Sequence, residues 1–178
     1  MNEKTVDNLL DGCRKSERRS QEELYRLFYA YGITVAIHYV SDSDTAKSIY
    51  NDAMFKVFLN IHQYKEDSPF KAWLRRIVIN TAIDHNRKYA NEMSVEMEDV
   101  AYQVPTYSSV FSKFETDDIL LVISKLAPSY RTVFLLHNIE GLKFHEIATE
   151  LNITEGGAKT LYHKAKQKLQ VILADYFE

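Results

Sequence analysis

The sequence predicts an all-α protein: two small helical domains joined by an acidic linker, with a helix-turn-helix in the C-terminal domain. Apolar residues recur with the helical period along most of the 178 residues, and the chain has only 5 glycines and 3 prolines, as long helices require. No stretch shows the alternating pattern of a strand between turn signals. One stretch breaks the helical period. It divides the chain into a domain at 1–90, a linker at 91–114 and a domain at 115–178.

Four helices are expected in the N-terminal domain. They fall at about residues 5–15, 18–38, 43–61 and 69–88. Residues 41–44 (SDSD) offer caps for the third helix, and Ser68 followed by Pro69 is a start signal for the fourth. Gly32 lies inside the second helix, where we expect it to lower helix stability.

Apolar residues mark the expected inner faces of the third and fourth helices. These residues are Ala46, Ile49, Ala53, Phe55 and Phe58 on the third helix, and Phe70, Trp73, Leu74 and Ile77 on the fourth. Arg76, Asn80 and Arg87 lie within about 40° of one another on a different face of the fourth helix, with Asp84 beside them. This stripe either grips an extended partner or is a solvated surface with ion pairs, such as Asp84 with Arg87 or Lys88.

The net charge of −3 is unevenly distributed along the chain. Residues 91–118 hold seven acids and one base, which leaves +3 for the rest of the chain, and residues 71–90 carry +4. Local charge decides whether a surface can bind a polyanion, so the negative total does not exclude DNA as a partner. The acidic stretch also contains Pro105 and no sustained period, which is typical of a linker.

In the C-terminal domain we expect helices at about 115–126 and 128–139, then a helix-turn-helix at 142–169. Gly141 ends the helix before the helix-turn-helix. The first helix of that motif has apolar residues at the i, i+3, i+4, i+7 spacing of one helical face: Phe144, Ile147, Ala148 and Leu151.

The predicted turn of this motif is Asn152-Ile153-Thr154. Asparagine enters the left-handed region more readily than most residues, so Asn152 suits a tight turn. Ile153 can fill the gap between the two helices, and the Thr154 hydroxyl can cap the second helix.

The second helix of the motif has an apolar and a basic face. Ala158, Leu161, Tyr162, Ala165 and Leu169 share the inward arc, whereas Gly156, Lys159, Thr160, His163 and Gln167 lie opposite, flanked by Lys164, Lys166 and Lys168. Four lysines and no acid lie between Gly156 and Gln170. The glycines Gly156 and Gly157 leave N–H groups uncovered at a positive helix end, where a phosphate can approach. The alternative is an ordinary helical hairpin with a solvated lysine face.

Catalytic motifs are lacking. The sequence contains no GxxxxGK loop, no CxxC pair and no HExxH, and His145-Glu146 is not followed by the second histidine of a zinc site. Cys13 is expected to be a packing thiol, and His38, His62, His85 and His137 are too dispersed to suggest metal ligands. We expect no enzyme activity, no cofactor and no metal.

The sequence also indicates a cytoplasmic protein. The single cysteine allows no internal disulfide, which fits a reducing compartment. No apolar run approaches the roughly 18 residues of a membrane span, and the N-terminus has no signal-peptide pattern.

Both halves of the chain resemble one family, the sigma-70 family of bacterial RNA polymerase sigma factors. Residues 126–169 are similar to region four, which reads the minus-thirty-five promoter element. Residues 43–61 (SDTAKSIYNDAMFKVFLNI) and 68–88 (SPFKAWLRRIVINTAIDHNRK) are similar to region two of the small extracytoplasmic-function (ECF) branch. The resemblance implies an alternative sigma factor that directs core RNA polymerase to specific promoters. It also implies promoter DNA as a partner, and an anti-sigma factor, of which some are membrane-anchored.

The family's roles carry over to matching positions of this chain. The resemblance implies polymerase binding by Asp44, Ile49, Asn51, Asp52, Phe55 and Lys56. It implies minus-ten contacts from Tyr64, Arg76, Asn80, Asp84 and Arg87. It implies minus-thirty-five contacts from Thr154, Gly156, Gly157, Lys159, Thr160, His163, Lys164, Lys166 and Gln167.

The chain departs from the family at several positions. Lys47 and Ser48 stand where relatives often have acids, and Leu161 follows Thr160 where an arginine is usual. The lysines Lys164 and Lys166 replace arginines, which keeps phosphate binding but disfavours bidentate guanine readout. Two alternatives stay open: a stand-alone helix-turn-helix regulator, and a sigma-like protein that binds polymerase but no promoter.

Overall fold

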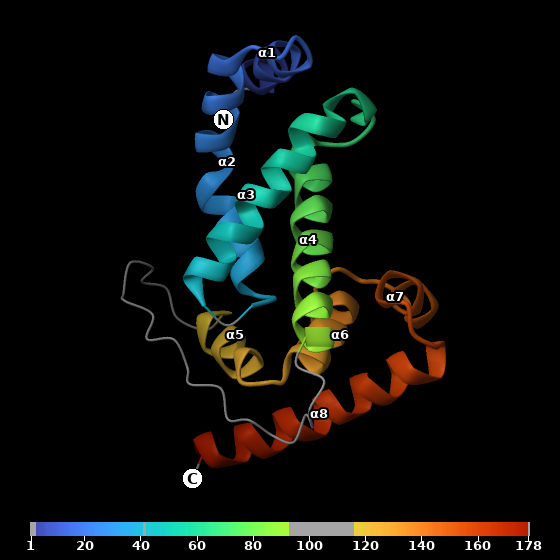
Figure 1. Cartoon of the computed structure of the whole chain (residues 1–178). Coiled ribbons are helices and arrows are strands. Elements are labelled where there is room, and N and C mark those ends of the chain that lie inside the picture. Colours follow the sequence, from blue (N-terminus) through green and yellow to red (C-terminus); the bar gives the residue numbers. More distant parts are fainter. Residues whose placement is uncertain (1–2, 41, 93–115, 178) are drawn as a thin grey trace. The chain divides into compact units, whose positions relative to one another are not determined.

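The computed structural model describes residues 3–40, 42–92 and 116–177, and within these ranges it contains helices and no strand (Figure 1). The elements are α1 (Glu3–Arg14), α2 (Arg18–Ile37), α3 (Ser43–Asn60), the 3-10 helix η1 (Ile61–Gln63), α4 (Phe70–Glu92), α5 (Thr116–Ser124), α6 (Pro128–Asn138), α7 (Phe144–Leu151) and α8 (Glu155–Phe177). The all-α prediction is confirmed, and most helix ends fall within two residues of their predicted places.

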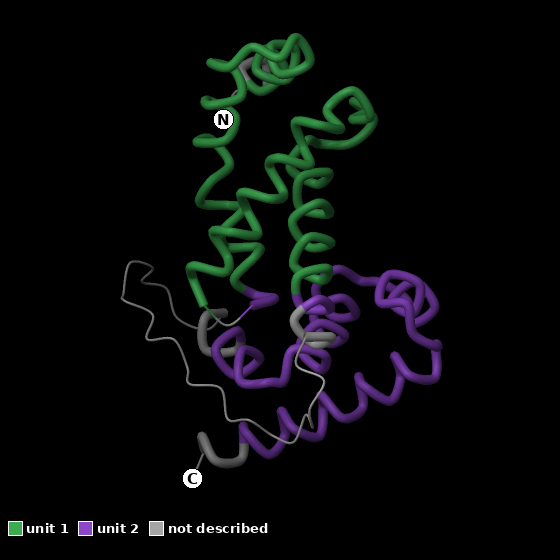
Figure 2. The backbone as a smooth tube through the Cα atoms, viewed as in Figure 1, with its two compact units in different colours: residues 1–37, 42–85 green, residues 38–41, 86–178 purple. Residues whose placement is uncertain are grey.

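The chain forms two compact units (Figure 2). Unit 1 comprises residues 1–37 and 42–85, and unit 2 comprises residues 38–41 and 86–178. Helix α4 runs to Glu92, four residues beyond the predicted end at Lys88. Most of the predicted linker, from residue 93 to residue 114, lies outside the described residues.

Unit 1 is built around the packing of α2 against α1 and α3. Its core side chains are at most 3 % exposed, and they include Leu10, Leu24, Phe28, Ala53, Val57, Leu74 and Val78. The Phe28 and Phe70 rings meet edge-on with centroids 5.1 Å apart, which joins α2 to the start of α4. Trp73, predicted to be a core residue, is only half-buried.

Helices α2 and α3 are in tight contact at Gly32. A Cβ atom at this position would lie 2.2 Å from two ring carbons of Tyr50. Tyr50 is 0 % exposed, and its hydroxyl donates to the Tyr25 carbonyl at 2.7 Å, so its ring is fixed from both sides. Gly32 therefore lets the two helices pack closely, a benefit that the helix-propensity argument alone does not give.

The start of α3 is fixed by a side-chain cap. The Asp42 carboxylate accepts the backbone N–H of Thr45 at 2.7 Å. Partial burial acts to raise the pKa of Asp42, but the hydrogen bonds from Thr45 outweigh it and lower that pKa below its ordinary value. The cap therefore stabilises the fold at neutral pH, and this contribution is lost as the pH falls through the lowered pKa.

Unit 2 packs α5, α6 and α7 against α8. Arg131 on α6 is 0 % exposed, and its Nη2 donates to the carbonyls of Ser124 and Leu126, which holds the turn between α5 and α6. Gly141 has φ +71°, so its position after α6 requires the left-handed conformation that glycine adopts without strain. It ends the helix as predicted.

No helix in the described part of the chain is both long enough and apolar enough to span a membrane.

We expect Gly32→Ala to destabilise unit 1 by about 1–3 kcal/mol, because the added methyl group overpacks against a fixed ring. Alanine is the better helix former by about 1 kcal/mol, so propensity alone predicts the opposite sign. Trp73, the single tryptophan of the chain, lies in unit 1, so its fluorescence during urea unfolding reports on this unit.

Gly156→Ala is the matched control, since nothing lies within 4 Å of a Cβ atom at that position. Circular dichroism should show no loss of stability for this variant. An unchanged or raised unfolding midpoint for Gly32→Ala would contradict the close-packing account.

Candidate nucleic-acid interface

Helices α7 and α8 form the predicted helix-turn-helix. Asn152 ends α7 in the left-handed conformation, with φ 54° and ψ 48°, and the N–H of Ile153 donates to the Ala148 carbonyl at 3.0 Å. The Thr154 hydroxyl accepts the N–H of Gly157 at 3.0 Å and so caps α8. Both turn predictions are confirmed. Ile153 remains 37 % exposed, so it fills the gap between the helices only in part.

The inner face of α8 packs through small and aromatic residues. Ala158 and Ala165 are 0 % exposed, which lets neighbouring helices approach closely. Tyr162 lies in an aromatic cluster, with ring centroids 4.8 Å from His137 and 5.4 Å from Phe144. Nδ1 of His137 lies 2.9 Å from the Leu142 carbonyl. His137 is therefore a packing residue that ties α6 to the helix-turn-helix.

The outer face of α8 is open to solvent. Exposed residues on it are Gly156, Lys159, Thr160, His163, Lys164, Lys166 and Gln167, as predicted, with Thr154 exposed just before the helix and Gly157 half-buried. The Thr160 hydroxyl donates to the Gly156 carbonyl at 2.9 Å. Lys159 forms an ion pair with Glu155 at 2.7 Å, and this hydrogen bond lowers the pKa of the Glu155 carboxyl. Lys159 is thus the one lysine of the predicted contact set that shares its charge with an acid in the described structure.

The polar stripe of α4 is a second exposed surface. Arg76 and Arg87 are exposed, whereas Asn80 and Asp84 are half-buried. Asp84 forms an ion pair with Lys56 of α3 at 3.4 Å, with both side chains 43 % exposed. This pair links the polar stripe of α4 to α3.

Tyr64 does not lie on this surface. It is 8 % exposed, its hydroxyl donates to the Ser68 carbonyl at 2.6 Å, and its ring packs against Phe70 and Trp73 with centroids 5.5 and 5.3 Å away. Burial raises the pKa of the Tyr64 hydroxyl, and the negative charge of nearby Glu66 raises this pKa further. In this conformation the ring supports the loop from inside, and the minus-ten contact implied for Tyr64 stays a prediction.

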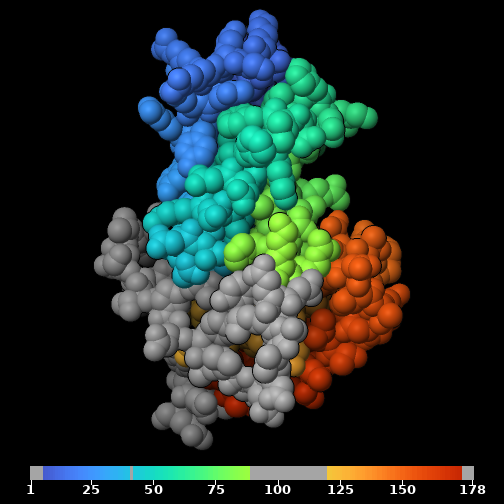
Figure 3. All heavy atoms as spheres, in the orientation of Figure 1, coloured from blue at the N-terminus to red at the C-terminus, as the bar shows by residue number. Residues whose placement is uncertain are grey.

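A third surface is the outer face of α3, a helix whose atoms are visible on the side of unit 1 seen in Figure 3. Phe55 is 65 % exposed and Leu59 is 64 % exposed, and they lie one helical turn apart. Asp52 is exposed and Lys56 half-buried on the same face. The expectation that Phe55 faces the core is wrong. Leu59 is not among the predicted site residues, although its i+4 spacing from Phe55 places it on the same helical face.

Three other predicted residues of α3 differ in their surroundings. Ile49 is 1 % exposed, so in this structure it is a core residue. Its implied role in polymerase binding stays a prediction. Asn51 is exposed and accepts a hydrogen bond from the Tyr25 hydroxyl at 2.7 Å, and Asp44 pairs with Lys47 at 2.9 Å.

No cluster of three or more potential metal ligands occurs among the described residues. Cys13 is 2 % exposed, and burial, followed by the charge of Glu17, raises the pKa of its thiol to about 11. A buried thiol with a raised pKa is a poor nucleophile.

Comparisons with known proteins match both halves of the chain. The family model for sigma-70 region 2 matches residues 24–92, and the model for sigma-70 region 4 matches residues 116–169. The ECF RNA polymerase sigma factor SigW of Bacillus subtilis (strain 168) is 31 % identical over 142 residues, which cover 73 % of this chain and 76 % of SigW. SigM of the same bacterium, also an ECF sigma factor, is 23 % identical over 158 residues, covering 85 % of this chain and 93 % of SigM.

The fold also has a counterpart among solved structures. The sigma factor RpoE, in its co-crystal structure with the anti-sigma factor NepR from Bartonella quintana, aligns with a TM-score of 0.52 at 23 % identity, covering 86 % of this chain and 96 % of that chain. The two family matches and the identity to SigW show that the chain belongs to the sigma-70 family, as an alternative sigma factor of the ECF branch.

Proposed function

We propose that this sigma factor works through three surfaces: the outer face of α3 for core RNA polymerase, the stripe of α4 for the minus-ten element, and the outer face of α8 for the minus-thirty-five element. The observation that carries the proposal is the exposed apolar pair on α3, Phe55 and Leu59. An exposed apolar pair on a second unit suits a protein partner, whereas binding DNA through a helix-turn-helix does not require it.

The proposed polymerase surface combines apolar and charged groups. Phe55 and Leu59 supply the apolar centre, and Asp52 and Lys56 lie one turn before them on the same face. Interfaces gain most of their binding energy from a few large side chains that become fully desolvated. The family assigns such contacts to the largest polymerase subunit, and we propose the same partner here.

The two DNA surfaces differ in chemistry. On α4, Arg76 and Arg87 offer exposed guanidinium groups that suit phosphates, and Asn80 between them offers an amide that can pair with a base. On α8, the positive N-terminal end near Gly156 and the lysines suit phosphates, whereas Thr160 and His163 can reach base edges.

The remaining parts of the proposal follow from the family. The two domains, 1–90 and 115–178, bind separate promoter elements, with 91–114 as the linker. The protein acts in the cytoplasm, where the polymerase and its template are, and it has no catalytic site of its own. RpoE of Bartonella quintana was solved with an anti-sigma factor, which supports an anti-sigma factor as a partner here as well.

Transcription from a promoter library tests the function directly. The library is randomised at both elements and transcribed by core polymerase with and without the protein. We expect transcripts that need the protein and that come from one pair of elements, which define the selected promoter. Polymerase binding without promoter choice would support the promoter-blind alternative.

We expect Phe55→Ala to weaken binding to core polymerase about tenfold or more, because a central apolar contact is lost. The fold should be unaffected, since the side chain is 65 % exposed. Asp52→Lys should also weaken binding with unchanged thermal stability. The measurement is the dissociation constant of a labelled protein for core enzyme.

Leu27→Ala on α2 is the matched control, because Leu27 is also an exposed apolar residue, at 38 %. It should bind like the wild type. If Leu27→Ala loses affinity and Phe55→Ala does not, the interface lies on α2 and the α3 proposal fails.

On α8, base and phosphate contacts should separate by their effects. Thr160→Ala and His163→Ala should relax preference within the upstream element, since one base contact discriminates by about 1–3 kcal/mol. Lys164→Ala should weaken binding to every promoter and reduce the salt slope by about 0.9. Library transcription reads the preference, and holoenzyme binding at several salt concentrations gives the slope.

Arg19→Ala provides the control for a lost surface cation, because Arg19 lies on α2 with its side chain 93 % exposed. Its salt slope should equal that of the wild type. Wild-type promoter choice and slope in all three α8 variants would show that this helix does not read DNA.

A further inference from the structure

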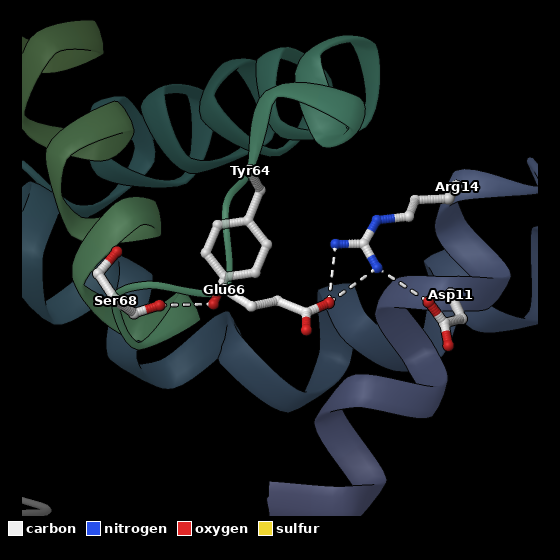
Figure 4. Close-up of polar contacts among 5 residues, drawn as sticks. All are labelled: Asp11, Arg14, Tyr64, Glu66 and Ser68. Atoms are coloured by element: carbon white, nitrogen blue, oxygen red, sulfur yellow. Dashed lines mark hydrogen bonds and ion pairs between the residues drawn. The ribbon is translucent and has the colours of Figure 1, made fainter.

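The loop between η1 and α4 is fastened at its middle to α1. Both terminal nitrogens of Arg14, in the last turn of α1, donate to one carboxylate oxygen of Glu66 at 3.2 Å (Figure 4). Nη1 of Arg14 also donates to the Asp11 carboxylate at 2.8 Å. The Arg14–Glu66 pair joins residues 52 positions apart, so it fixes the loop to a different part of unit 1.

The same loop is also held at its ends. The buried Tyr64 ring anchors the first loop residue against Phe70 and Trp73, and its hydroxyl holds the Ser68 carbonyl near the start of α4. With Glu66 bound by Arg14, three points hold the five residues from 64 to 68. Of the three points, only Glu66 is held by an ion pair, and its side chain is 69 % exposed. A mutation of Glu66 can therefore release the loop from α1 without opening the core.

Helix α1 is a firm base for Arg14. It packs on α2 and η1, and Leu10 and Cys13 are 1 % and 2 % exposed. The chain then turns through Ser16, which has φ +59°, and the N–H of Glu17 donates back to the Gly12 carbonyl at 2.9 Å. A cation in the last turn of a helix also meets the negative end of the helix dipole.

Two physical roles for the pair can be distinguished. The loop contains two acids, Glu66 and Asp67, which would repel the phosphates of a nearby DNA strand. Arg14 could act only by screening Glu66. Arg14 could instead act by holding the loop in one conformation, so that DNA binding does not have to supply the entropy cost of ordering the loop.

We propose that Arg14 is a positioning residue for minus-ten recognition: through Glu66 it holds the loop that leads into α4 in one conformation before DNA binds. This inference rests on the proposed role of α4 in minus-ten binding. Arg14 itself makes no contact with DNA. The Glu66 side chain is 69 % exposed, so the pair is weak, and its loss should weaken minus-ten binding by about two- to five-fold.

A double-mutant cycle on the holoenzyme tests the proposal. The variants are Arg14→Ala, Glu66→Ala and both together, and each is bound to two fragments of the selected promoter. One fragment has its minus-ten region unpaired by mismatches, and the other is a duplex that ends upstream of the minus-ten element. Arg18→Ala is the control, because it removes an exposed arginine that pairs with Glu22 on α2, at 3.0 Å.

Positioning predicts that both single variants weaken binding to the unpaired fragment about two- to five-fold and that the double variant is no weaker than either. Binding to the upstream duplex and to core polymerase should not change, whereas general damage to the fold would lower both. The decisive variant is Glu66→Ala, which removes the acid and the tether together. If it binds as well as or better than the wild type, Arg14 only screens charge and the proposal is overturned.

The same measurement separates this inference from the proposed function. If the wild-type holoenzyme shows no preference for its own minus-ten sequence in the unpaired fragment, the role of α4 fails. If the wild type shows that preference and all three variants retain wild-type affinity, only the role of Arg14 fails.

Discussion

The burial of one stripe of α3 against α2 is the constraint on which the proposed work of unit 1 depends. Ala53 and Val57 are 0 % exposed on this stripe, next to the tight contact of Tyr50 with Gly32. At about 100° per residue, Phe55 and Leu59 then lie about 200° away and must face outward. Each forgoes part of the roughly 1.5–3 kcal/mol that full burial of a large apolar side chain provides. A partner that covers them recovers this free energy.

In unit 2, too, one face of a helix is buried and the opposite face is left exposed, here for a polar partner. The small residues Ala158 and Ala165 and the Tyr162 cluster direct one face of α8 inward, and helical geometry leaves the lysines of its outer face in solvent. Each proposed DNA surface lies on a single helix, and we expect the acidic stretch at 91–118 to oppose DNA binding by the free protein. Polymerase would hold both surfaces near one promoter, so that two weak contacts act as one strong contact.

Local signals predicted the fold well because capping and turn chemistry act within three or four residues, as at Asn152, Thr154 and Gly141. They could not predict which apolar side chains stay outside, since that depends on where neighbouring helices approach. The sequence therefore predicts Phe55 both in the core and at the interface, and it does not indicate that the Tyr64 ring is buried. The pairs Lys56–Asp84 and Arg14–Glu66 join residues 28 and 52 positions apart, so no local sequence pattern predicts them.

The most direct test of the account is photo-crosslinking from position 55 in the assembled holoenzyme. A photoreactive phenylalanine analogue replaces Phe55, and the products are separated by subunit and mapped by mass spectrometry. The account predicts a specific crosslink to the largest polymerase subunit, and none from the same analogue at position 27 on α2. A holoenzyme that forms normally but gives no crosslink from position 55 would contradict the claim that the exposed face of α3 is the polymerase-binding surface.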